Sequence, residues 1–482
     1  MITATESQPP RAAPASLTLV ERALKIFAEV KAGEGTTALL LTLNIFLLLL
    51  AYYLLKTARE PLILAGGPGA AEVKSYASGG MSILLLAWVP LYGFVAQRVG
   101  RVKLISIVTL FFASNLVIFY LLAHTLTGEL ALGRLGIAFF LWVGIFNVST
   151  IAQFWGFAAD IYTPEQGKRL FAILGIGAVI GAAVGAKLAS WLFAVLIPEG
   201  AKKGSSEGLT AAYTLMLIAA AILVLNLGLT WIVNKRDVAS GTSDEGAPAP
   251  KTEQPLGKEN AFALILKDKY LLLIGALTLV LNCVNSTGEY VLDRTLVAAV
   301  AVSGDDPSRF IGTFKGNYFA YVNVIGVVMQ LFVVSRVIKY IGIRGALFVM
   351  PAISLVGYST MSVAPILSLI FVAKIAENSM DYSLQNTTRQ ALWLPTSRDA
   401  KYKAKAAIDT LLVRGGDVLS TGLVALGAVF AFGTKTFAVF NVALVLTWLA
   451  IVWFLGRTYA ERTANLPAGK TSGDAGEKEA AG

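Results

Sequence analysis

The sequence predicts an all-α polytopic membrane protein with about twelve transmembrane helices in two six-helix halves. Hydrophobic residues make up 56% of its 482 residues and charged residues only 15%, with a mean hydropathy of +0.68. One soluble core could not bury so much apolar surface. The apolar residues gather in runs long enough to cross a bilayer, and one polar segment divides these runs into two equal sets.

Each expected span is a window of about 20 mostly apolar residues, which is enough to cross the hydrocarbon core. In chain order the windows are 36–56, 78–97, 104–124, 135–158, 169–197, 210–234, 269–292, 316–335, 344–363, 365–386, 406–431 and 434–456. Gly, Pro, Ser and charged residues between the sixth and seventh windows predict a flexible linker. The expected organisation is a cytoplasmic N-terminal segment (1–35), a first half (36–236), a cytoplasmic linker (237–268), a second half (269–457) and a disordered cytoplasmic tail (458–482).

The N-terminal segment and the basic residues predict the orientation. Residues 1–16 are polar and lack the pattern of a cleavable signal peptide, so the first span is expected to act as the targeting signal. Residues 16–33 place apolar side chains on one helical face, as in a helix lying on a membrane surface. Most Lys and Arg residues are cytoplasmic if both termini are inside, which predicts that orientation. The net charge of +10 then reflects membrane topology rather than nucleic-acid binding.

Loops at corresponding positions of the two halves share a weak repeat. "GFVAQRVGRVK" ends the second window and "VVSRVIKYIGIRG" ends the eighth, with rough counterparts of Arg98, Gly100 and Arg101 at Arg336 or Lys339, Gly342 and Arg344. The first loop also resembles the loop pattern of major facilitator transporters, with Gln97 in place of the usual acid. Parallel repeats with a site between them are typical of alternating-access transporters, so a major-facilitator-like fold is expected.

Charged residues inside the expected spans are the best guide to a site, because each costs on the order of 3 kcal/mol or more at the bilayer centre. Lys56 and Arg59 lie about one turn apart in "YYLLKTAREPL" and could present two positive groups to one anion. Alternatively, they lie at the outer end of the first helix, where they pair with Glu60 or reach the headgroups.

A charged stripe is expected on the tenth span, where Lys374, Glu377 and Asp381 recur at helical spacing in "AKIAENSMDYSLQ". Such a stripe must face a neighbouring helix or water. Substrate contact would explain it, and so would a salt bridge between Lys374 and Glu377.

Glu289 and Asp293 in "NSTGEYVLDRTL" share a helical face, where like charges repel unless a cation, a proton or a basic residue joins them. They are candidates for ion coupling, or for a gate with Arg59 or Arg414. We expect Glu60, Glu377 and Asp417 to belong to the same coupling or gating group.

Other motifs give no support to an enzyme or to a metal site. "AGGPGA" at 65–70 and "AGKTSG" in the tail lack the P-loop spacing, which excludes ATP hydrolysis within this chain as the energy source. His124 has no cysteine or acid cluster near it, and the lone Cys283 cannot form an intrachain disulfide. No cofactor is predicted. Gly177, Gly181 and Gly185 form a small-residue ridge that allows helices to approach and slide, although static packing is the simpler account of any one of them.

The segment "DYSLQNTTRQALWLPTSRDAKYKAKAAIDTLLVRGGD" resembles the signature region of the ATP/ADP translocase family, the nucleotide transporters of plastids and intracellular bacteria. The matching positions are Tyr382, Ser383, Thr388, Arg389, Trp393, Pro395, Lys401, Lys403, Lys405, Ala406, Ala407, Ile408 and Asp409. "FWGFAADIYTPEQGKRLFAILGIGA" is similar to the family's junction of the fourth and fifth helices. "LLKTAREPLIL" looks like its first-helix motif, with Arg59 and Glu60 standing for a lysine and an aspartate.

The resemblance runs over nearly all of the span region and implies a twelve-helix major-facilitator-like fold that exchanges nucleotides. In the family, charged residues of the first, fourth, seventh and eleventh helices matter for transport, which implies Glu289 as the seventh-helix acid. The fourth-helix acid is missing, with Asn147 and Gln153 the nearest polar residues, and Asp293 and Asp417 stand where lysines are usual. Losing this positive charge should weaken a site for ATP.

A basic cytoplasmic loop is expected between the tenth and eleventh windows, with Arg389, Lys401, Lys403 and Lys405. These residues would hold the loop on the cytoplasmic side of the membrane, interlock the two halves at a cytoplasmic gate, or attract polyanions to the mouth of a cavity.

We therefore predict a secondary transporter that exchanges ATP and ADP, or moves another nucleotide or phosphorylated anion, by alternating access. Its expected substrate contacts are Lys56, Arg59, Lys374 and Arg414. As a relative of that family it is expected to lie in the lipid bilayer of a bacterial-type inner membrane, to bind no nucleic acid and to function as a monomer. Two alternatives remain open: a proton-coupled major facilitator transporter of a non-nucleotide metabolite, with Glu289 and Asp293 carrying the proton, and a non-transporting membrane scaffold or sensor.

Overall fold

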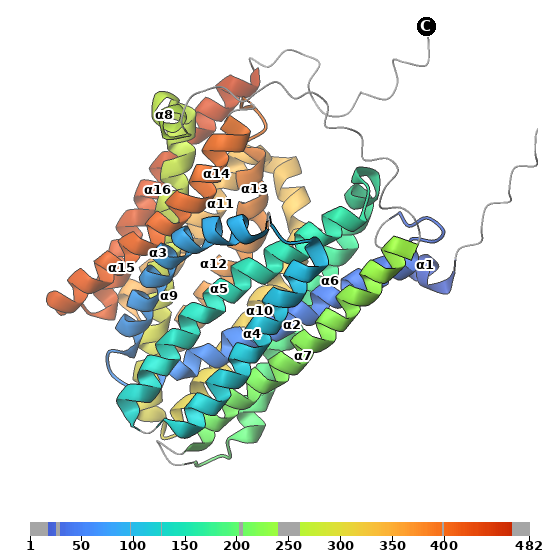
Figure 1. Cartoon of the computed structure of the whole chain (residues 1–482). Coiled ribbons are helices and arrows are strands. Elements are labelled where there is room, and N and C mark those ends of the chain that lie inside the picture. Colours follow the sequence, from blue (N-terminus) through green and yellow to red (C-terminus); the bar gives the residue numbers. More distant parts are fainter. Residues whose placement is uncertain are drawn as a thin grey trace, which may run out of the picture.

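The computed structural model describes residues 18–25, 29–96, 98–126, 128–201, 206–239, 261–397 and 400–464. Within these residues the fold is all-helical (Figure 1). The long helices of the first half of the chain are α2 (Gly35–Leu64), α3 (Ala70–Ala96), α4 (Arg101–Thr125), α5 (Glu129–Ile161), α6 (Pro164–Leu196) and α7 (Ser206–Ala239). Those of the second half are α9 (Lys269–Ser303), α10 (Pro307–Val328), α11 (Val334–Val363), α12 (Leu367–Met380), α15 (Val413–Val429) and α16 (Thr434–Ala464). Shorter helices are α1 (Leu19–Leu24), α8 (Ala261–Lys267), α13 (Asn386–Ala391) and α14 (Lys405–Ala407).

Ten helical stretches of the described residues are long and apolar enough to cross a membrane. One of them, 307–363, is 57 residues long and holds two of the expected spans. A π-helical turn at Met329–Val333 joins α10 to α11, and Gly342 then breaks the helix at φ 67° and ψ 177°, a backbone region that favours glycine. A further helical stretch, 367–391, carries the charged stripe at its centre. Each expected window thus falls on a helix.

Several helices are longer than the apolar windows that predicted them. Helix α10 begins at Pro307 because the Asp306 side chain accepts hydrogen bonds from the backbone N–H groups of Ser308 and Arg309. Helix α16 continues to Ala464, beyond the expected boundary at 457, and Arg462 in its last turn lies 2.5 Å from Asp268. Apolar windows mark the hydrocarbon depth, whereas helices continue into the interface.

Parts of the terminal and linker predictions fall outside the described residues, namely 1–17, 240–260 and 465–482. Within the described part, α1 covers only six residues of the expected amphipathic helix, and α8 packs on α9 inside the expected linker. The orientation in a membrane stays a prediction.

The helices pack as two groups, α2–α7 and α9–α16, that lie side by side (Figure 1). In the first group α2 packs against α5, α6 and α7, and in the second α9 packs against α12, α15 and α16. Close approach of α6 to α2 depends on the predicted glycine ridge. A Cβ at Gly181 would lie 2.3 Å from the carbonyl oxygen of Phe46, and one at Gly185 would lie 2.5 Å from that of Leu50.

The two groups meet mainly through α3 with α9 and α15, and through α10 with α2 and α6. We call the end of the bundle where α2 starts and α16 finishes the terminal end, and the opposite end, with the α2 to α3 turn, the hairpin end. Contacts near the hairpin end include Lys187 to Asn317 at 2.8 Å and Tyr290 to Glu72 at 2.6 Å. These contacts join the groups at the hairpin end.

Candidate substrate site

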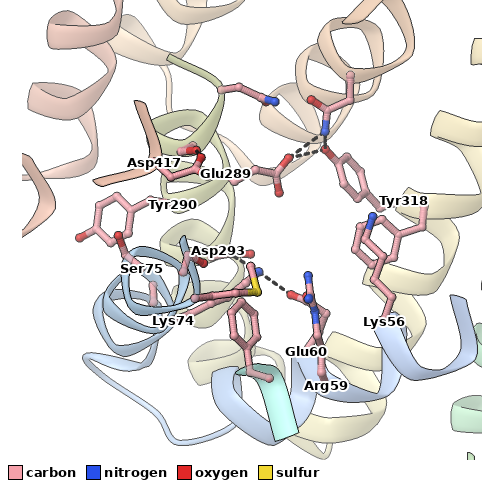
Figure 2. A pocket seen from close by; sticks show the side chains of 18 of the residues that line it. Lys56, Arg59, Glu60, Lys74, Ser75, Glu289, Tyr290, Asp293, Tyr318 and Asp417 are labelled. Carbon is pink, nitrogen blue, oxygen red and sulfur yellow. Dashed lines mark hydrogen bonds and ion pairs between the residues drawn. The ribbon is translucent and has the colours of Figure 1, made fainter. Parts of the chain in front are cut away.

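A cavity of about 230 Å³ lies between the two helix groups (Figure 2). Helices α2, α3, α5, α9, α10, α12 and α15 all contribute to its wall. The wall contains these residues proposed from the sequence: Lys56, Arg59, Glu60, Glu289, Asp293 and Asp417. Residues far apart in the chain are thereby brought together at the junction of the halves, where the repeat predicted a site.

The two cations of α2 both keep donors available to a ligand. Lys56 Nζ lies 5.0 Å from the centre of the Tyr53 ring and 4.3 Å from that of Phe319, and no ion pair joins it to a carboxylate of the described residues. Arg59 uses its Nε on Glu60 at 3.2 Å, and its guanidinium lies 4.4 Å from the Phe140 ring. Figure 2 shows both side chains on one side of the cavity, with Glu60 beside Arg59.

The two acids of α9 are joined by lysines that the sequence analysis missed. Lys315 of α10 has its Nζ 2.5 Å from Asp293 and 3.8 Å from Glu289. Lys74 of α3 lies 2.7 Å from the other oxygen of Asp293 and 2.5 Å from Glu60. Of the three partners considered for the acid pair, a cation, a proton or a basic residue, the structure provides a basic residue. It is Lys315, together with Lys74, rather than Arg59 or Arg414, which the sequence analysis suggested as gate partners.

Lys374 is fully buried and is not among the residues lining the cavity. Its Nζ lies 2.6 Å from Glu377, 3.0 Å from the side-chain oxygen of Asn285 and 3.8 Å from Glu289. Tyr358 donates a further hydrogen bond to Glu377 at 2.9 Å. The salt-bridge interpretation of the charged stripe fits this position, and direct contact of Lys374 with a substrate does not.

Arg414 is also absent from the cavity wall. It lies 3.5 Å from Asp417, whose carboxylate accepts hydrogen bonds from Ser286 at 2.6 Å and from Ser82 at 3.0 Å. Asp417 therefore ties α15 to α9 and, across the two groups, to α3.

Together these residues form one ion-pair network of alternating charge. In order it contains Arg59, Glu60, Lys74, Asp293, Lys315, Glu289, Lys374 and Glu377. Positive and negative groups are equal in number, which offsets the cost of placing them inside a bundle of apolar helices. Lys74 and Lys315 carry the network across the junction, because Lys315 also lies 3.9 Å from Glu60.

The predicted basic loop lies nearer the terminal end, outside this cavity wall. Arg389 lies 4.0 Å from Asp409. Lys401 and Lys403 lie in a π-helical turn at Ala400–Ala404, and Lys405 lies between this turn and a second one at Ile408–Leu412. The Tyr270 hydroxyl of α9 donates to the carbonyl of Leu392 at 2.6 Å and so anchors the segment to the second helix group.

A family model described as "TLC ATP/ADP transporter" matches residues 137–360 and 353–459, which is more than half of the chain. The chain belongs to the TLC ATP/ADP transporter family. This confirms the family predicted from the signature segment, which is a family of transporters and not of enzymes.

Among curated relatives, ADP,ATP carrier protein 1 of Chlamydia trachomatis is 22% identical over 345 residues, 66% of this chain and 64% of that protein. The match therefore spans somewhat less than two thirds of that relative. ADP,ATP carrier protein 5 of Rickettsia conorii is 26% identical over 341 residues, 65% of this chain and 66% of that protein.

Solved structures of similar shape confirm the major-facilitator-like fold. A bacterial homologue of the iron transporter ferroportin in an inward-facing state has a TM-score of 0.62 at 14% identity, covering 89% of this chain and 99% of that one. The POT family transporter PepTSo has a TM-score of 0.61 at 11% identity, covering 88% and 98%. At such low identity the likeness concerns the fold alone.

Proposed function

We propose that this transporter exchanges nucleotides such as ATP and ADP, or closely related phosphorylated anions, by alternating access. The observation that carries the proposal is the pair Lys56 and Arg59 on one face of α2, in a cavity between the two helix groups. The family and its ADP,ATP carrier relatives give this anion site its expected ligand class.

The cavity offers two kinds of contact that suit a nucleotide. Ammonium and guanidinium groups bind phosphate oxygens through charge-assisted hydrogen bonds, and the guanidinium can do so with two donors at once. Tyr53, Phe140 and Phe319 surround these cations, and such rings also stack on bases. The volume of about 230 Å³ is below the roughly 300–1,000 Å³ typical of ligand pockets, so the cavity accommodates only part of a nucleotide.

Alternating access would use the contacts at the hairpin end as the closed gate. Separating the groups there breaks the pairs of Lys74 with Asp293 and of Lys315 with Glu60. The first group then carries Lys56, Arg59 and Lys74 against the single carboxylate of Glu60, an excess of two positive charges in the cavity wall. An anionic substrate bound there compensates that charge, which favours movement of the loaded over the empty transporter and hence exchange.

The proton-coupled alternative receives less support from the site. Glu289 and Asp293 were candidates for carrying a proton because two adjacent carboxylates repel. Lys315 lies between them and relieves that repulsion without a proton.

Transport in proteoliposomes tests the proposal. Vesicles loaded with unlabelled ADP should take up labelled ATP in a saturable manner, and vesicles without internal nucleotide should take up much less. Arg59→Gln and Lys56→Gln should each reduce uptake at least tenfold, because each removes a charge-assisted contact to phosphate. Lys103→Gln is the matched control, since Lys103 is exposed on α4 outside the cavity. Uptake of ATP at the level of empty vesicles, with the protein shown to be folded, would refute nucleotide exchange.

A further inference from the structure

A second polar cavity adjoins the first. It has a volume of about 280 Å³ and is lined by Asp381, Tyr382, Asn386 and Arg389. Tyr382 lines both cavities, so they share a wall at this residue. The segment runs from α12 through a π-helical turn at Asp381–Gln385 into α13, in the direction of the terminal end. Turns of this kind inside a helix often mark functional positions.

The polar groups of this second cavity are largely unpaired. Among the described residues, Asp381 and the side chain of Asn386 make no hydrogen bond or ion pair, and Arg389 lies as far as 4.0 Å from Asp409. Every carboxylate of the ion-pair network, in contrast, has a cation beside it. A lone carboxylate within a spanning helix is costly, and a ligand that donates hydrogen bonds to it would offset that cost.

We propose that Asp381, Asn386 and Arg389 form a nucleobase subsite, while Lys56 and Arg59 hold the phosphates. This inference rests on the proposed function. Charge decides the orientation of the nucleotide: the unpaired carboxylate of Asp381 repels phosphate and accepts a hydrogen bond from an exocyclic amine. The amide of Asn386 offers both a donor and an acceptor, which matches the paired edge atoms of adenine. The Tyr382 ring at the shared wall supplies a stacking surface.

The subsite predicts selectivity for bases that carry an exocyclic amine. In ITP a carbonyl oxygen replaces the amine of ATP, and in UTP one replaces the amine of CTP. That oxygen would face the Asp381 carboxylate, so that two acceptors meet without a proton between them. A binding site that hydrogen-bonds a ligand amine rejects an analogue that lacks it more strongly than an apolar pocket does.

Competition in proteoliposomes tests the subsite. Uptake of labelled ATP is measured against unlabelled ATP, ITP and inorganic tripolyphosphate. For the wild-type protein, ITP should compete about tenfold less well than ATP, the effect of one hydrogen bond to a charged group. In Asp381→Asn the ratio of competition by ATP to competition by ITP should fall towards one, while tripolyphosphate competes as before. Glu461→Gln removes an exposed carboxylate of α16 and should behave as wild type. Asn386→Ala, at an exposed side chain, should reduce the ratio in the same way without changing charge.

Three results would overturn the subsite while leaving nucleotide exchange intact. The first is equal competition by ATP and ITP in the wild-type protein. The second is an Asp381→Asn variant that keeps the ATP to ITP ratio but loses the pH dependence of uptake for all substrates, which is the behaviour of a proton site. The third is loss of tripolyphosphate competition in Arg389→Gln but not in Lys56→Gln, which would place the phosphates in the second cavity. Failure of the proposed function is distinct, since wild-type vesicles would then take up no ATP, and the subsite would fall with it.

Discussion

The Lys315 ammonium lies 2.5 Å from the Asp293 carboxylate, and both residues are almost completely buried at the junction of the two helix groups. This contact joins α10 to α9, and Lys315 reaches α2 through Glu60 at 3.9 Å. One lysine of α10 therefore compensates carboxylates from two other helices, α9 and α2.

Replacing Lys315 by methionine should destabilise the protein strongly. Methionine fills a similar volume but leaves the neighbouring carboxylates without this cation, and breaking a buried pair from one side costs roughly 3–5 kcal/mol. The midpoint of thermal unfolding in detergent should fall markedly. Lys435→Met, at an exposed lysine of α16 near the same end, is the control and should leave the midpoint nearly unchanged.

Removing the opposite charge should partly rescue that variant. The double variant Lys315→Met with Asp293→Asn has one uncompensated carboxylate fewer, so its midpoint should lie above that of Lys315→Met alone. A double variant no more stable than Lys315→Met would show that the two charges are not coupled.

The sequence predicted the helices and the polar character of the cavity better than it predicted the pairing within it. Long apolar windows and costly intramembrane charges are local signals, which is why Lys56, Arg59, Glu289 and Asp293 were recognised. The acid pair on α9 even pointed to a partner, which could be a cation, a proton or a basic residue. Which residue supplies it depends on the packing of α3 and α10 against α9, and no pattern along the chain contains that information.

Lys74 and Lys315 were missed for a second reason. Both lie just outside the windows expected at 78–97 and 316–335, where a lysine is usually an interfacial residue that reaches the headgroups. Helices α3 and α10 begin earlier, at Ala70 and Pro307, so the lysines point into the bundle. The N-cap sequence Asp306 and Pro307 was the available signal for the earlier start of α10.

Glu34, before the first span, should make stability depend on pH in the acid range. Burial acts to raise the pKa of Glu34, but hydrogen bonds from Arg169 at 2.8 and 3.1 Å, from the Lys31 backbone and from Gln166 hold that pKa below its ordinary value of 4.5. A depressed carboxylate pKa adds stability above the unfolded value, and this stability is lost as the pH falls through the folded value.

Glu34→Gln should therefore melt below wild type at pH 7, and the difference should shrink as the pH falls below about 4.5. Melting curves over this range check the prediction, with Glu461→Gln as the control for removal of an exposed carboxylate. A constant difference at all pH values would indicate that the Glu34 charge does not contribute.

The glycine ridge should tolerate no added methyl group where α6 meets α2. Gly181→Ala would bring its Cβ against the Phe46 carbonyl at 2.3 Å, so the two helices must move apart. Overpacking of this kind costs about 1–3 kcal/mol, and the thermal midpoint should fall. Gly175→Ala on the same helix meets no atom within 4 Å and should not lower the midpoint, because alanine favours helix. Equal effects at the two positions would argue against close packing as the cause.

A cysteine pair across α3 and α15 should lock the hairpin end and stop turnover. A Cβ at Gly79 would lie 3.0 Å from the Thr421 Cβ. This is slightly shorter than the distance of about 3.5–4.5 Å that usually separates the two Cβ atoms of a disulfide. In Gly79→Cys with Thr421→Cys, the Thr421 Oγ1 and Cγ2 atoms, which would lie 2.6 and 2.9 Å from the new Cβ, are gone. Oxidation should form the bond and abolish exchange of labelled nucleotide, because the groups can no longer separate there, and a reductant should restore exchange. Each single cysteine variant, which also retains the buried Cys283, controls for oxidation elsewhere. Full exchange in the crosslinked protein would mean that the hairpin-end contact of α3 and α15 stays closed throughout transport, and the gate would then have to lie in the contacts of α10 with α2 and α6.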